Sequence, residues 1–259
     1  MTLLYVGKGF QNVLLITATI TPKPGTPNIS RVDPKERLSD YREALNFYLD
    51  QIETTFDHLM FCENSDSDVS ALHELVESRK LSDKVTFFVK DGLNYPPHFD
   101  RGYGEFKLID DAMNSIPEAQ GSQKVVWKVT GRYIIRNIAA VVRRATPPFD
   151  IACNFRNYPK HWIDTYLIAW TPAAYAKHLS GVYDKLKTNV PEVTLGVSAE
   201  ELLRAYLESR TGLSVLPRFA VTPDVRGVRA ADNQSYEDNF NMKYQIRRIL
   251  NFCLPRIWI

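Results

Sequence analysis

Short apolar segments recur along the first 155 residues, and they constrain the fold of this chain more than any other feature. The first is VLLITATI at 13–20, and comparable segments follow at 58–62, 85–89, 125–133 and 149–155. Each is almost continuously apolar, which is typical of parallel strands covered on both faces. Apolar residues at helical spacing separate several of them, at 34–52, 69–76 and 106–116. This alternation predicts an α/β fold in which the strands at 13–20, 58–62, 85–89 and 125–129 form one mainly parallel sheet.

Two segments carry the signature of a helix start. Asp33 precedes Pro34, a residue favoured at the first helical position, and Glu36 stands where a capping box places its acidic residue. Ser198 and Glu201 have the same spacing and predict a capping box at the start of a helix over 198–209. The remaining sequence after residue 160 has no single dominant period.

Composition excludes several classes of protein. The 259 residues include 32 basic and 30 acidic ones, a formal net charge of +2, so global charge does not predict binding to nucleic acid. No apolar run approaches the roughly 18 residues of a membrane span. Cys62, Cys153 and Cys253 are far apart and lie in or beside apolar stretches, so we expect buried, reduced thiols. These features favour a cytoplasmic protein.

Polar clusters follow the predicted strands, where the carboxyl ends of parallel strands meet along one edge and form a ligand site. One is Glu63-Asn64-Ser65, and a second runs from Arg101 to Glu105 with glycines at 102 and 104. The third is Lys128-Val129-Thr130-Gly131-Arg132-Tyr133. Free N–H groups at a helix start favour an anion, so the glycines are candidates for a phosphate loop or a plain turn. Lys128 and Arg132 predict a diphosphate site, with a surface ion pair as the alternative.

The order of these segments resembles the nucleotide-sugar half of GT-A glycosyltransferases, in particular those of bacterial capsule, lipopolysaccharide and O-antigen synthesis. The similar pieces are ITATI, DPKERLSDYREAL, the ENS turn, GYGE before a helix, and KVTGRY, within residues 12–165. The resemblance implies a single GT-A-like, Rossmann-like domain over 1–259. Residues 12–145 would bind the donor, 146–242 would form the acceptor side, and 243–259 would be a basic aromatic tail.

The resemblance also implies roles for individual residues. Thr17, Thr19 and Glu63, with Asn64 and Ser65, would surround the base and ribose, and Gly102, Gly104 and Glu105 would face the donor sugar. The KVTGRY segment stands where GT-A enzymes usually carry a DXD metal motif. No acidic pair is present there, so Lys128 and Arg132, with Thr130, Gly131 and Tyr133, would hold the leaving diphosphate instead.

We therefore expect no metal cofactor, with Mn²⁺ or Mg²⁺ as the less favoured alternative. A literal DXD occurs at Asp66-Ser67-Asp68, but acidic residues before a helix are typical N-terminal residues. Asp110-Asp111 lies inside a predicted helix and is expected to be a solvated face. The histidines show no metal-ligand spacing.

An inverting transfer needs a carboxylate that takes the proton of the acceptor hydroxyl. The candidates are Asp164, which aromatic residues flank, and the Glu200-Glu201 pair. Glu201 has the alternative role of a capping-box residue, Glu200 that of a surface charge, and a retaining mechanism needs no such base. Asn154, Arg156 and His161 are candidate acceptor contacts, with a plain surface histidine as the alternative for His161.

The segment 243–259 mixes basic with apolar and aromatic residues. It predicts either a peripheral contact with an anionic membrane surface or a C-terminal helix docked on the domain. The predicted function is transfer of a sugar from a nucleoside-diphosphate sugar to a glycan or lipid-linked glycan of the bacterial surface, without nucleic acid as a partner. A non-catalytic nucleotide- or glycan-binding domain and a sugar nucleotidyltransferase are the alternatives.

Overall fold

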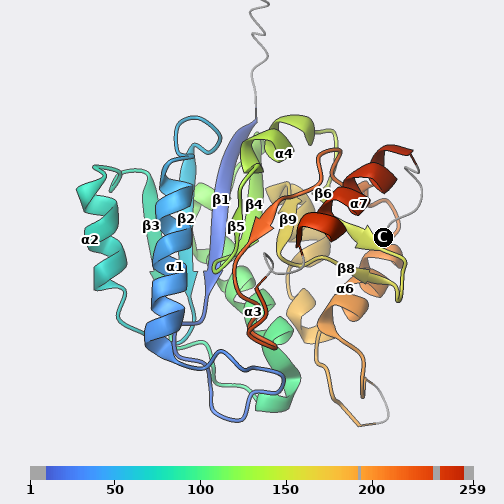
Figure 1. The fold of residues 1–259 in the computed structure, drawn as a ribbon, viewed down its shortest axis with the longest axis horizontal. Coiled ribbons are helices and arrows are strands. Elements are labelled where there is room, and N and C mark those ends of the chain that lie inside the picture. Colours follow the sequence, from blue (N-terminus) through green and yellow to red (C-terminus); the bar gives the residue numbers. More distant parts are fainter. Residues whose placement is uncertain (1–9, 192–193, 236–239, 254–259) are drawn as a thin grey trace, which may run out of the picture.

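A computed structural model describes residues 10–191, 194–235 and 240–253. In this part of the chain a seven-stranded sheet has the order β10-β6-β9-β4-β1-β2-β3 (Figure 1). Its strands are β1 (Gln11–Ala18), β2 (His58–Glu63), β3 (Val85–Val89), β4 (Lys124–Thr130), β6 (Ile151–Ala152), β9 (Leu167–Trp170) and β10 (Val215–Leu216). The pairs β1–β2, β1–β4 and β2–β3 are parallel, which confirms the predicted sheet.

One strand, β9, departs from the expected pattern. It lies between β4 and β6 and runs antiparallel to both. The predicted fifth strand at 149–155 contributes only Ile151–Ala152 to the sheet. The fourth strand ends at Thr130 rather than at Tyr133, because the chain turns at Gly131, whose N–H donates to the Thr17 carbonyl of β1.

Helices cover both faces of the sheet, each on its own apolar core. The first face packs against α1 (Pro34–Leu49), α2 (Ser70–Ser78) and α4 (Ile138–Arg144). The second packs against α3 (Asp100–Ser115), the turns of α5 (Pro172–Ala174) and the π-helix at 175–179, and α6 (Ala199–Glu208). The short strands β5 (Ile134–Ile135) and β11 (Val225–Arg226) pair with each other, as do β7 (Phe155–Arg156) and β8 (Trp162–Ile163). Helix α7 (Phe240–Cys253) ends the described part.

The helix starts are only partly as predicted. Ser198 and Glu201 form the expected capping box. Asp33 caps α1 by accepting from the Lys35 N–H, but Glu36 pairs with Arg31 at 3.1 Å instead of closing a capping box.

Cys62 and Cys153 are buried, whereas Cys253 is exposed on α7, so the expectation of a third buried thiol is wrong. Burial raises the pKa of the Cys62 and Cys153 thiols well above the ordinary range. None of the described helices combines the length and hydropathy that crossing a bilayer requires.

Candidate functional site

The carboxyl ends of β1, β2 and β4 meet at one edge of the sheet, toward the bottom of Figure 1, where α3 begins. The register places Thr17 of β1 opposite both Cys62 of β2 and Thr130 of β4. An edge of this kind is where open α/β sheets bind ligands. We call it the carboxyl edge.

A polar network lies beneath α3 at this edge. The Oε1 atom of Glu105 is 2.7 Å from Nζ of Lys128 and accepts hydrogen bonds from the hydroxyls of Thr17 at 2.6 Å and Thr130 at 3.1 Å. Lys128 also donates to the Thr130 hydroxyl at 3.0 Å and to the carbonyl of Thr165 at 2.6 Å. An ammonium group has three protons, so these three protein acceptors satisfy Lys128 completely.

This geometry determines the direction in which the pKa values of Lys128 and Glu105 are shifted. Lys128 is fully buried, and burial lowers its pKa, against the opposing effect of Glu105. Burial alone would raise the pKa of Glu105, but the Lys128 charge and the hydrogen bonds from Lys128, Thr17 and Thr130 outweigh it, so the pKa lies below its ordinary value. Glu105 is therefore held as a carboxylate.

The second carboxylate oxygen of Glu105 is the chemically open part of this network. The side chain is 21% exposed, and no described residue donates a hydrogen bond to Oε2. The network thus fixes an ionised carboxylate at the carboxyl edge and leaves one oxygen accessible. Such an oxygen can accept a hydrogen bond from a hydroxyl group of a ligand.

The Glu63-Asn64-Ser65 turn is held by a buried carboxylate. Glu63 is completely buried and accepts from the N–H groups of Ile20 and Ser65, both at 2.9 Å, and of Ser67 at 3.2 Å. The Ser65 hydroxyl also donates to it. Glu63 therefore holds the loops that follow β1 and β2 together, a role that the sequence did not reveal.

Thr19 and Asn64 are hydrogen-bonded to each other. The Thr19 hydroxyl donates to Oδ1 of Asn64 at 2.6 Å, and the amide of Asn64 reaches the Gly104 carbonyl at 3.4 Å. The first turn of α3 is therefore tied to the turn after β2.

Glycines at the start of α3 allow close helix packing. A Cβ atom on Gly102 would stand 2.2 Å from Cβ of Ala199, the first residue of α6. A Cβ on Gly104 would stand 2.0 Å from the hydroxyl of Tyr95. Gly102 thus lets the N-terminal ends of α3 and α6 approach each other, and Gly104 makes room for Tyr95.

Lys128 and Arg132 do not converge, although the sequence analysis treated them as a pair. Lys128 faces α3, whereas Arg132 lies on the α1 side of the sheet. There the Arg132 side chain is hydrogen-bonded to Tyr41, and its Nη1 donates to the Val228 carbonyl at 2.8 Å. Tyr41 in turn accepts from the Thr19 N–H at 2.9 Å. Arg132 therefore still borders the end of β1, and its buried Nε has no hydrogen-bond partner in the described chain.

The turn at Gly131 causes this separation. A Cβ atom on Gly131 would lie 2.6 Å from both Cγ2 of Ile16 and the Thr17 carbonyl. The glycine lets the chain cross over β1, after which Tyr133 and the following β5 lie on the α1 face, with the Tyr133 carbonyl accepting from Tyr48.

The three candidate bases differ in what binds them. Asp164 accepts from Nε of Arg156 at 2.9 Å and also from its Nη2, and it lies in the turn after β8. Glu201 is engaged by the capping box and by Lys160 at 3.3 Å. No residue in the described part of the chain forms an ion pair or hydrogen bond with Glu200, whose charge acts on Lys128. Glu200 is thus the candidate whose carboxylate remains open beside the network.

The candidate acceptor residues lie around the β7–β8 hairpin. Arg156 is buried in its pair with Asp164, and Asn154 accepts from the Phe219 N–H at 3.0 Å. Both hold the fold locally, while the exposed His161 lies in the loop of the hairpin. The same loop carries Tyr158, which is 72% exposed.

Among the described residues, no group of three or more His, Cys, Asp or Glu side chains is placed to hold a metal ion. Asp68 accepts from the N–H of Ser70, the first residue of α2, at 2.8 Å, although the N-cap position itself is Val69. Asp110 accepts from the Tyr175 hydroxyl and the Gly181 N–H, and Asp111 pairs with Lys90 and Lys107. The expectation that Asp110 and Asp111 form a merely solvated face is therefore wrong.

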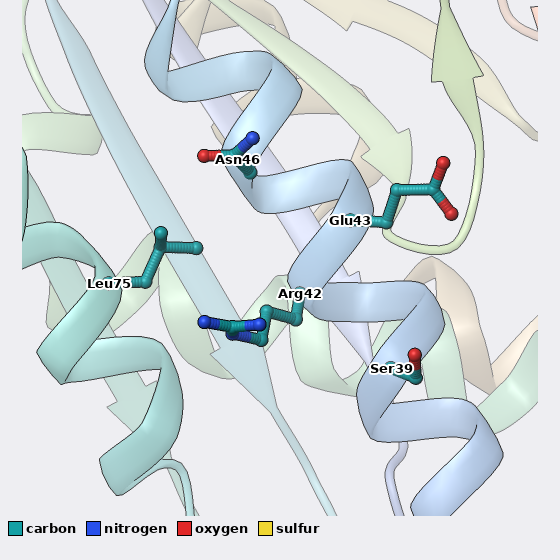
Figure 2. Close-up of a pocket in the computed structure, with 5 residues that line it drawn as sticks. All are labelled: Ser39, Arg42, Glu43, Asn46 and Leu75. Atoms are coloured by element: carbon teal, nitrogen blue, oxygen red, sulfur yellow. The ribbon is translucent and has the colours of Figure 1, made fainter.

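Two hollows of the surface lie outside the network. One of about 350 Å³ lies between α1 and α2, and Figure 2 shows Arg42 reaching across it toward Leu75. It is lined by the outer side of α1, away from the carboxyl edge. A second hollow, of about 120 Å³, borders Arg132, Arg226 and Val228.

The fold of this chain is similar to those of several solved structures. No protein-family model matches the chain, and a search of curated proteins found no match. The structure of the glycosyltransferase GlyE from Streptococcus pneumoniae TIGR4 is similar, with a TM-score of 0.50, 8% identity, and coverage of 96% of this chain and 53% of GlyE. The inositol-1-phosphate CTP transferase from T. maritima gives a TM-score of 0.46 at 10% identity over 94% of this chain and 97% of that one.

The galactosyltransferase LgtC gives a TM-score of 0.46 at 7% identity over 78% of this chain and 72% of LgtC. At these identities the comparison concerns the fold alone. With the observed sheet, the likeness to GlyE confirms the predicted GT-A-like, Rossmann-like α/β class with a mainly parallel central sheet.

Proposed function

We propose that this protein is a glycosyltransferase that takes a sugar from a nucleoside-diphosphate donor at the carboxyl edge. The observation that carries the proposal is the Glu105 carboxylate, which Lys128, Thr17 and Thr130 fix through one oxygen while the other stays accessible. A rigid, ionised acceptor is suited to sugar hydroxyls, and the residues that support Glu105 come from two strands of the edge, β1 and β4.

The donor would lie across the end of β1. Its nucleoside would contact Thr19 and Asn64, and its sugar would hydrogen-bond to Oε2 of Glu105. Arg132 would approach the diphosphate from the α1 side with the Nε–H that no described group accepts. Since Lys128 has its three donors satisfied, its role in this proposal is to position Glu105 rather than to bind phosphate.

The reaction assigns the base role to Glu200. An acceptor hydroxyl oxygen forms a bond to the anomeric carbon, the bond from that carbon to the diphosphate oxygen breaks, and its electron pair leaves with the diphosphate. Glu200 takes the hydroxyl proton, and Arg132 stabilises the negative charge that develops on the leaving group. This route inverts the anomeric centre.

The acceptor we propose is a glycan of the bacterial cell surface, as the resemblance of the donor half implies. Exposed Tyr158 and half-buried Trp162 in the β7–β8 hairpin offer aromatic faces, and Lys160 links this hairpin to Glu201 at the start of α6. Aromatic faces beside polar groups suit the apolar and hydroxyl-bearing faces of a sugar.

The test is a panel of nucleoside-diphosphate sugars assayed for thermal stabilisation and for slow donor hydrolysis without acceptor. We expect stabilisation and release of nucleoside diphosphate, both weakened in Glu105→Gln and unchanged in Glu77→Gln, an exposed glutamate of α2. Binding without hydrolysis or transfer would instead identify a non-catalytic domain. Release of pyrophosphate from a nucleoside triphosphate and a sugar phosphate would identify a nucleotidyltransferase.

A further inference from the structure

Helix α7 presents its apolar side to solvent. It is the red helix in Figure 1. Among the side chains of α7 that the structure describes, Tyr244, Arg247 and Leu250 are half-buried, and the charge of Arg247 acts on Tyr166, just before β9. The half-buried residues described on α7 thus include a charged one, Arg247.

The opposite side carries a stripe of exposed apolar residues. Met242 is 74% exposed, Ile246 47% and Ile249 59%, and Cys253 is exposed as well. These positions are four, three and four residues apart, which places them on one face of the helix. We call this face the α7 stripe.

All the charged residues of α7 are basic. The sequence of α7 contains Lys243, Arg247 and Arg248 and no acidic residue. Arg248 is exposed and, by helical spacing, lies on the flank of α7 between the α7 stripe and the half-buried residues. An apolar stripe bordered by cationic side chains is the pattern of a helix that lies in the headgroup region of a membrane.

We propose that the α7 stripe docks the protein on an anionic lipid surface. Met242, Ile246 and Ile249 enter the boundary between headgroups and acyl chains, and the exposed Arg248 approaches the anionic headgroups. The charge of the helix favours lipid over a second copy of the chain, because two copies paired through this stripe would bring their cationic residues together. The inference does not depend on the proposed catalytic activity.

The experiment is flotation of the full chain with vesicles of phosphatidylcholine alone or mixed with phosphatidylglycerol, at low and high salt. We expect binding to the mixed vesicles only, and weaker binding at high salt. The double variant Ile246→Ser/Ile249→Ser should lower the partition coefficient by about tenfold or more, since both apolar side chains are lost. Arg248→Gln should lower it by about fivefold, the effect of one basic residue near the surface.

Leu195→Ser is the matched control, because Leu195 is 73% exposed elsewhere on the surface, and it should bind like the wild type. Equal binding to both kinds of vesicle, or wild-type binding by the double variant, would overturn the proposal. So would a lipid-free dimer that the double variant converts to a monomer, since the stripe would then be an interface between copies. Unchanged melting temperatures of the variants exclude loss of folding.

Discussion

Glu105 of α3 and Lys128 of β4 form an ion pair of 2.7 Å, in which the lysine is completely removed from solvent and the glutamate is 21% exposed. Because the pair joins the first half of a helix to a central strand, it sets the position of α3 over the carboxyl edge. The same pair orients the accessible oxygen of Glu105.

Removing one member of this pair should destabilise the fold strongly. Lys128→Met leaves a largely desolvated carboxylate without its cation, and breaking a buried pair in this way costs about 3–5 kcal/mol. In the double variant Lys128→Met/Glu105→Gln the loss should be smaller than the sum of the two single losses. Urea unfolding of the four proteins measures the coupling, and additive losses would contradict an energetic link between the two residues.

Stability should also depend on pH through Glu105. Its folded-state pKa lies below the ordinary value of 4.5, so the unfolded chain binds the proton more readily. The contribution of Glu105 is present above pH 4.5 and is lost as the pH falls through its lowered folded-state pKa. Glu105→Gln should therefore lose less stability than the wild type on acidification. If the unfolding free energies of the wild type and Glu105→Gln fall equally as the pH is lowered, this assignment is refuted.

The contact between Gly102 and Ala199 predicts a compensating pair. Gly102→Ala places two Cβ atoms 2.2 Å apart, so α3 and α6 must separate at the candidate site. Overpacking of this kind costs about 1–3 kcal/mol. In Gly102→Ala/Ala199→Gly the same methyl group moves to the other helix, and most of the loss should be recovered. Thermal melts test the stability and donor binding tests the site; failure of the second change to rescue either would argue against this contact.

Glu200 should be the carboxylate on which turnover depends. Glu200→Gln is expected to lower kcat on the order of 10²-fold or more, in line with loss of a general base. Glu201→Gln should affect mainly stability, by about 1 kcal/mol, because its role is helix capping. Asp164→Asn, which weakens the pair with Arg156, serves as a second comparison. A large kcat loss in Asp164→Asn with normal Glu200→Gln turnover would reassign the base.

Activity should persist in the presence of a chelator. Arg132 supplies positive charge near the end of β1, where the proposed reaction releases a diphosphate, so a divalent ion is not required for that purpose. The assay compares transfer with EDTA, with Mn²⁺ or Mg²⁺ added back, and in Asp66→Asn and Asp68→Asn. Loss with EDTA, recovery with Mn²⁺ and inactivity of both variants would together establish a metal-dependent reaction.

Much of the fold could be predicted from local sequence. The apolar strand segments and the helical spacing between them are properties of neighbouring residues, so the parallel strands β1 to β4 and the helices α1, α2, α3 and α6 follow from periodicity. The Ser198–Glu201 capping box is local for the same reason. The antiparallel β9 could not be placed in this way, because a four-residue apolar segment does not specify its partners or direction.

Local sequence predicted only part of the candidate site. The sequence by itself determined that polar residues follow the strands and therefore meet at the carboxyl edge. Only the tertiary structure decided that Lys128 turns toward Glu105 on one face of the sheet, while Arg132, four residues later, turns toward Tyr41 on the other. The physical reason is that the turn at Gly131 and the choice of buried partners depend on contacts between distant segments, which the spacing of two cations does not encode.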